Sequence, residues 1–159
     1  TRVHGSGLCA RSPMRWEDRV AGFAEVSDIL WRERELLDVL LFKLDQERLL
    51  LADGEVRWLA RATREIDLVL EQIRLTELSR AIEVDALAAE LDLEPGPNLA
   101  ALAQAAPSPW RELFTAHRAA FVTLTAQVIA CAESNRRALK QAWKAANETL
   151  LAVSSDGTD

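Results

Sequence analysis

The feature that most constrains this chain is an apolar position that recurs every seven residues in its first third. It is occupied by Phe23, Leu30, Leu37, Leu44 and Leu51, and this spacing is typical of a helix that packs along a coiled-coil seam. Further apolar residues widen the stripe beyond a strict heptad, so at least two surfaces must bury the helix.

A turn and a second periodic run follow directly. Asp53-Gly54 is the first turn signal after the long helical pattern,. Two long apolar-striped helices joined by a tight turn make an antiparallel hairpin, which we predict to pair residues 16–51 with residues 55–91. The predicted core seam is Phe23, Leu30, Leu37, Leu44, Leu51, Leu59, Ile66 and Ile73, and the second run continues through Leu75, Leu78 and Ile82.

Two proline-containing segments, EPGPN at 94–98 and PSP at 107–109, interrupt the helical pattern. The residues between them favour a short helix across the end of the bundle. Pro109 suits the first position of a helix that has Ser108 as its N-cap, so a third long helix is predicted from Pro109 to about Val153. The fold class is therefore all-α: a long antiparallel hairpin plus a long C-terminal helix, in a three- to four-helix bundle.

Length and composition fit one folded unit. The chain has 159 residues, of which 49% are hydrophobic, and it contains only six glycines and five prolines,. Residues 1–13 have no apolar periodicity, and Met14, the only methionine, directly precedes the first helical pattern, which leaves open whether translation begins there. We predict a disordered leader over residues 1–15, a single helical domain over 16–153 and a disordered tail over 154–159.

Charge and cysteine usage exclude several classes of function. Residues 16–93 hold 19 acidic and ten basic residues, whereas residues 107–153 hold three and six, and no Lys/Arg run exceeds Arg136-Arg137. This pattern argues against nucleic-acid binding and favours complementary helix faces over a binding patch. Cys9 and Cys131 belong to no metal or disulfide motif. Without a long uncharged apolar run or a signal peptide, we predict a cytoplasmic protein with no membrane insertion.

Residues that carry chemistry are sparse. His117 has no Glu or Asp three residues before it, which excludes a Glu-x-x-His di-iron pair, and Cys131 lies among alanines without a cation beside it,. The segment TREIDLVLEQIR, 63–74, resembles the Arg-x-Ile-Asp helix of all-helical chorismate mutases, although charge pairs around Ile66 and Ile73 account for the same residues. We predict no enzyme activity, no metal and no cofactor, with such a small helical enzyme as the remote alternative.

Taken as a whole, the pattern resembles the FlgN family of flagellar export chaperones. Four segments carry the resemblance, in order: LLDVLLFKLDQERLLLADGEVRWL, LTELSRAIEVDALAAELDL, PNLAALAQAAP and AESNRRALKQAWKAANETLL. The order and the lengths of these segments carry more of the resemblance than any single motif. One departure is that family members often show two closely spaced asparagines in the last helix, whereas Asn135 and Asn147 are twelve residues apart here.

The resemblance implies a cytosolic chaperone that binds unpolymerised hook-associated (junction) proteins through their C-terminal helices and delivers them to the export apparatus. The candidate partner-binding residues lie on the last helix: Asn135, Leu139, Trp143, Ala146 and Leu150. The same residues are also placed to close the bundle's own core, and Asn135 either fixes a register or reaches a partner backbone. The alternative function is a generic coiled-coil interaction module, and pairing as a homodimer stays open.

Overall fold

The computed structural model describes residues 16–156, which form four helices and contain no strand. They are α1 (Trp16–Asp53), α2 (Val56–Glu90), α3 (Leu99–Ala105) and α4 (Trp110–Asp156). The predicted all-α fold, with a long hairpin and a long C-terminal helix, is confirmed. The predicted leader, residues 1–15, lies outside the described residues, as do residues 157–159.

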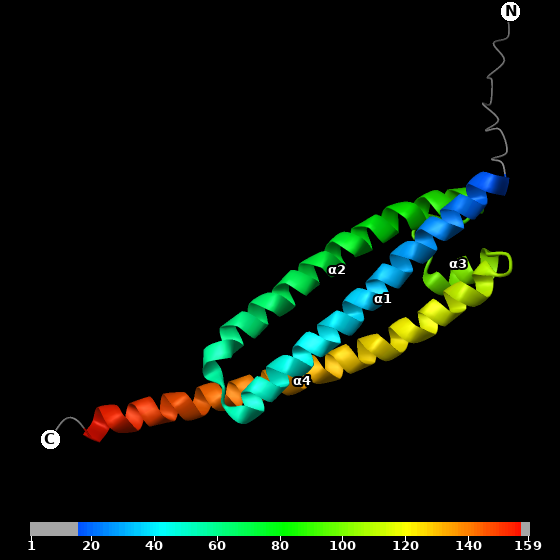
Figure 1. The fold of residues 1–159 in the computed structure, drawn as a ribbon. Helices are drawn as coiled ribbons and strands as arrows, with labels where there is room; N and C mark the ends of the chain where they lie inside the picture. The colour runs from blue at the N-terminus through cyan, green and yellow to red at the C-terminus, as the bar shows by residue number, and fades with distance from the viewer. Residues whose placement is uncertain (1–15, 157–159) are drawn as a thin grey trace, which may run out of the picture.

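The three long helices run side by side, with α1 in contact with both α2 and α4, while α3 packs on α4 near the start of α1 (Figure 1). The chain reverses between α1 and α2 at Gly54, whose φ of +70° lies in the left-handed region that favours glycine,. The turn closes through a hydrogen bond of 3.0 Å from the amide of Glu55 to the carbonyl of Leu50. This end of the hairpin is called the base below.

The core consists of two clusters along the bundle. The first lies at the α3 end and joins all four helices through Phe23, Val26, Leu30, Leu87, Leu102, Ala103, Ala106 and Phe114. The second lies closer to the base and centres on Leu40, Leu44, Ile66 and Val69, with Val128 and Cys131 of α4 packed against it. Side chains from α1, α2 and α4 thus share both clusters.

The residues of the predicted seam differ in burial. Phe23, Leu30, Leu44 and Ile66 are buried, whereas Leu37, Leu51, Leu59 and Ile73 are half-buried.

The predicted continuation of the second run is wrong for its later part, because Leu75, Leu78 and Ile82 are exposed. The inward face of α2 instead runs through Thr76, Val84 and Leu87. Apolar residues on both faces of α2 made the periodic pattern ambiguous.

The boundaries of α4 depart slightly from the prediction. The helix begins at Trp110, because the carbonyl of Pro109 already accepts the amide of Leu113 at 3.2 Å and Pro109 therefore sits at the cap position,. At the other end, α4 continues to Asp156, so residues 154–156 are helical where a disordered tail was predicted. The hydroxyl of Ser154 donates to the carbonyl of Leu150 at 2.6 Å, which satisfies this serine within the helix,.

Candidate functional site

The main surface feature is the last part of α4, which projects past the base of the hairpin (Figure 1). We call residues 139–156 the overhang. Every residue from Leu139 to Ser154 is exposed, and Trp143 and Leu150 keep 71% and 67% of their surface accessible. Large apolar side chains gathered on one exposed helix typically mark a surface that binds a partner.

The overhang continues the apolar face that α4 buries against α1. In the packed part of the helix, residues seven apart face the core, among them Phe114, Phe121 and Val128. Beyond them, steps of three and four residues place further apolar side chains on the same face. These are Leu139, Ala142, Trp143, Ala146, Leu150 and Val153. The face is therefore continuous, while the helices that cover it end at the base.

Asn135 marks the point where this coverage ends. Its side-chain amide donates to the carbonyl of Leu44 at 2.8 Å and to Oε2 of Glu47 at 2.9 Å, and Thr63 donates to the other carboxylate oxygen at 3.1 Å. The network joins α4, α1 and α2, and Asn135 is only 2% exposed. Of its two predicted roles, these contacts favour fixing the register of α4, and they separate Asn135 from the four exposed candidates.

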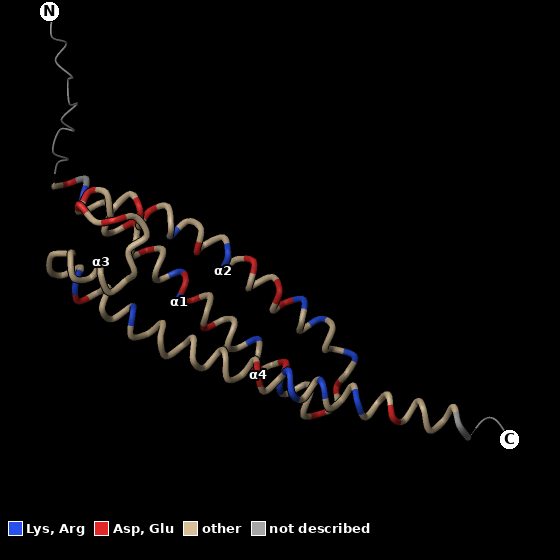
Figure 2. The backbone as a smooth tube through the Cα atoms, turned by 180° about the vertical axis from the view of Figure 1, so that it is seen from behind, with Lys and Arg blue, Asp and Glu red and all other residues tan. Residues whose placement is uncertain are grey.

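Basic residues surround the start of the overhang. Figure 2 shows a long uncharged middle of α4 followed by a group of cations where the helix leaves the hairpin. These cations are Arg136, Arg137, Lys140 and Lys144, all exposed. Within this group, Lys144 forms an ion pair with Glu148 at 3.8 Å. The group is thus available to steer an acidic partner, with an effect that salt would screen.

By length and composition alone, α4 is long and apolar enough to cross a membrane. Residues 110–154 contain an 18-residue window with a mean hydropathy of 1.2, and 11% of that window is buried. Val122 and Ile129 are exposed on the same helix. Length and composition alone would suit a membrane span, but the core helix of a soluble bundle passes the same test. Since the opposite face of this window packs on α1 through Val128 and Cys131, we assign it to the bundle.

His117 and Cys131, the two residues considered for chemistry from the sequence, lie fourteen residues apart on α4. His117 is fully buried with the ring of Trp31 at 4.8 Å, and burial, reinforced by the charge of Arg34, lowers its pKa. Burial raises the pKa of the Cys131 thiol, and the carboxylate of Asp45 raises it further, which makes the thiol a poor nucleophile,. Among the described residues, no group of three His, Cys, Asp or Glu side chains is placed to hold a metal ion.

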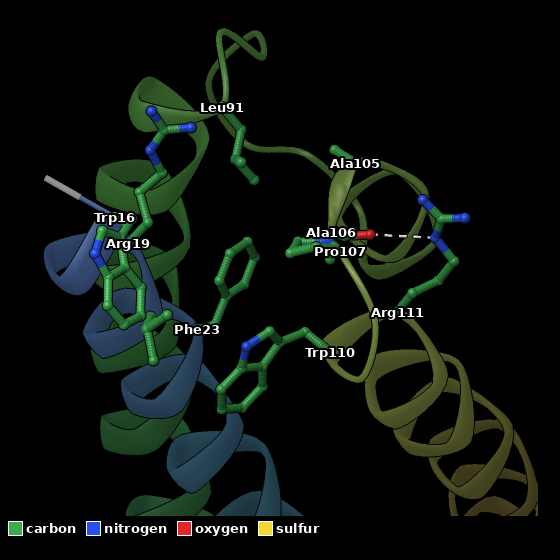
Figure 3. A pocket seen from close by; sticks show the side chains of 10 residues that line it. Trp16, Arg19, Phe23, Leu91, Ala105, Ala106, Pro107, Trp110 and Arg111 are labelled. Carbon is green, nitrogen blue, oxygen red and sulfur yellow. Dashed lines mark hydrogen bonds between the residues drawn. The ribbon is translucent and has the colours of Figure 1, made fainter. Parts of the chain in front are cut away.

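A hollow of about 610 Å³ lies at the opposite end of the bundle from the overhang (Figure 3). Phe23 and Trp110 stack across it with ring centroids 5.8 Å apart, and Arg19 and Arg111 also line it. Nε of Arg111 donates to the carbonyl of Ala106 at 3.1 Å, so this guanidinium is already held by the chain. Without a carboxylate, thiol or histidine in its lining, the hollow suits an apolar group rather than a reaction.

The helix that resembles chorismate mutase lacks the arrangement such an enzyme needs. Arg64 is exposed, and Arg74 pairs with Glu71 at 3.3 Å on the outer surface of α2. Thr63 is exposed, and its hydroxyl donates to Glu47 of α1. These arginines therefore do not converge between helices on a site for a small dianion.

The fold and the overhang define a class: an all-α protein in which the end of one long amphipathic helix is left uncovered by the other helices. The comparison with protein families is specific, because the family described as FlgN protein matches residues 14–159. The chain belongs to the FlgN family and is a flagellar export chaperone, as the sequence resemblance predicted. The comparisons with curated proteins and with solved structures gave no match.

Proposed function

We propose that this chaperone binds unpolymerised hook-associated (junction) proteins by holding a C-terminal amphipathic helix of the client against the overhang. The observation that carries the proposal is the continuous apolar face of α4, which extends past the base with Trp143 and Leu150 uncovered. An amphipathic helix binds such a face through apolar anchors spaced by three, four and seven residues.

The composition of the overhang suits a helix-on-helix contact. Ala142 and Ala146 lie on the apolar face between the large residues and are exposed, so a second helix has room to approach closely. Trp143 supplies a large rigid contact at low entropic cost, which is why tryptophan is enriched among the residues that dominate binding energy. The cations around it would raise the encounter rate with an acidic client more than the final affinity.

Covering the client helix explains the chaperone activity in physical terms. Junction proteins assemble through the same apolar helix face, so a client held on the overhang cannot polymerise before export. The complex would form in the cytoplasm and be handed to the export apparatus, where release of the client helix frees it for transport.

The test is to replace two overhang anchors one at a time. We expect Trp143→Ala and Leu150→Ala to weaken binding of a purified junction protein by ~2 kcal/mol or more, about 30-fold in Kd, measured by calorimetry. Each variant should lose less than ~1.5 kcal/mol of unfolding free energy, because both side chains are exposed in the free protein. Val122→Ala is the matched control, since Val122 is equally exposed on α4 but lies on the packed part of the helix.

Two results would contradict the proposal. A Trp143→Ala variant that is stable and binds the junction protein with unchanged Kd would place the client elsewhere. A variant that melts early and loses binding only in proportion to unfolding would make Trp143 a core residue.

A further inference from the structure

Three cations form a row along α4 where the overhang begins. Arg136, Lys140 and Lys144 follow each other at steps of four residues, which places them in one line on the helix surface, roughly 6 Å apart along its axis. We call them the basic row. All three side chains are exposed. Like charges at this spacing repel each other, so an acidic neighbour would stabilise the row.

The chain itself supplies little of this compensation. Between residues 43 and 80, six of the seven Lys and Arg side chains lie in ion pairs. In the basic row, Lys144 pairs with Glu148 at 3.8 Å, whereas Arg136 and Lys140 form no ion pair with the described residues. The row is therefore free to pair with the carboxylates of a partner, unlike most cations of the hairpin.

The rest of the overhang has the opposite electrostatic character. No Lys or Arg follows Lys144 in the sequence, and the last turn of α4 contains no basic residue. Glu148 is exposed there, and the free carbonyl groups at the end of α4 form the negative pole of the helix dipole. The overhang thus changes from positive at the base to negative at its tip (Figure 2).

We infer that the client helix lies antiparallel to the overhang, with an acidic C-terminal end against the basic row. The inference rests on the proposed function, because it concerns the same client on the same apolar face. In this direction the negative pole of the client helix meets the cations at the base, and its positive pole lies beside the negative tip of α4. A parallel client would bring like charges together at both ends, which complementary interfaces avoid.

A lipid surface is the other class of partner that an apolar helix with cations could suit. A helix that lies on an anionic membrane carries Lys and Arg along its polar face. Here the cations end at Lys144, whereas Leu150 and Val153 lie in the part of the helix that carries Glu148. This distribution favours a partner whose own charge changes from one end to the other, as that of a helix does.

Photo-crosslinking measures the direction of the client helix. A photoreactive amino acid replaces Lys140 in one chain and Leu151 in another, because both positions are exposed and lie eleven residues, about three turns, apart on the same side of α4,. Mass spectrometry then locates the residues of a purified junction protein that each position captures. We expect position 140 to capture residues near the end of the client, and position 151 to capture residues about eleven positions earlier in its sequence.

Charge reversal measures the contribution of the basic row. Lys140→Glu with Lys144→Glu should lower the association rate constant for the junction protein about 10-fold at low ionic strength, and added salt should reduce this loss. The control is Arg32→Glu with Arg118→Glu, which changes the net charge equally at exposed positions away from the overhang. The control should lower the rate constant less than about 2-fold. Circular dichroism establishes that both variants are folded.

Three results overturn the inference while the proposed function stands. Residues captured in the same order along both chains would show a parallel client. A folded reversal variant that associates as fast as the control would show that no acidic end meets the row. Binding to phosphatidylglycerol vesicles that only the reversal abolishes, with association to the junction protein unchanged, would assign the row to a lipid surface. If neither position captures the client and Trp143→Ala leaves its Kd unchanged, the proposed function fails as well.

Discussion

The two parts of α4 carry the same apolar pattern in opposite environments. In the part packed on the hairpin, Phe114 is completely buried, whereas in the overhang Trp143 keeps 71% of its surface exposed. The difference is the neighbour: α1 packs along the first part and α3 packs near its start, whereas α1 ends at Asp53 and leaves most of the second part uncovered. An amphipathic pattern thus shows which face of a helix can be buried. Whether residues of the same chain bury that face depends on how far the neighbouring helices extend.

The difference also has an energetic meaning. Burying a large apolar side chain is worth about 1.5–3 kcal/mol relative to leaving it in water. The packed part of α4 contributes that free energy to folding. The apolar side chains of the overhang stay exposed on folding, so the free energy of burying them remains available for association with a partner.

The largest expected effect on stability comes from removing a buried side chain from the packed part of α4. Phe114→Ala should lower the free energy of unfolding by about 3–5 kcal/mol, because the ring is fully buried and its removal leaves a cavity. Phe114 packs against Phe23 and Trp110, with ring centroids at 6.1 and 6.4 Å, so the loss affects the cluster that joins all four helices. Urea denaturation followed by circular dichroism measures the change.

Phe42→Ala is the matched control for this prediction, because it removes the same ring from an exposed position on α1. It should cost less than ~1 kcal/mol. Equal losses at the two positions would mean that α4 does not pack on the hairpin as described.

An intermediate effect is expected at the border between the two parts. Asn135→Ala removes two hydrogen bonds and leaves one carboxylate oxygen of the buried Glu47 without its donor, which should cost about 1–3 kcal/mol,. The control is Asn147→Ala in the overhang, an exposed asparagine of the same helix, which should change stability by less than ~0.5 kcal/mol. A loss at Asn135 no larger than that at Asn147 would show that the network does not hold α4.

Much of the fold follows from local chemistry and was predictable. The heptad of leucines and the Asp53-Gly54 turn located α1 and α2 to within two residues at each boundary, because a long stripe and a glycine turn leave few alternatives. The short α3 was expected between the two proline segments, and its start is fixed by Asn98, whose side chain accepts the amide of Ala101 at 2.9 Å,.

The candidate site was predictable only in part. It depends on how α4 is aligned with α1 and on where α1 ends, and the local sequence of α4 determines neither. Spacing placed Leu139, Trp143, Ala146 and Leu150 on one face, but could not decide between core and surface. It also placed Asn135 with them, since a sequence does not show which backbone an amide meets. The prediction did not include Val153, although it follows Ala146 by seven residues and this spacing places both on one face of the helix.

The smallest effect on stability is expected from the largest change in the chain, a truncation after Ala142 that removes most of the overhang. Every residue from Trp143 to Ser154 is exposed, so the truncation deletes no buried contact and should change the free energy of unfolding by less than ~0.5 kcal/mol,. The same truncation should abolish binding of a junction protein, because it removes Trp143 and Leu150, the proposed client anchors. Urea denaturation of the truncated and the full-length chain measures the change. A loss above ~1.5 kcal/mol under those conditions would mean that the overhang folds back onto its own hairpin, and the contrast between the two parts of α4 would then be wrong.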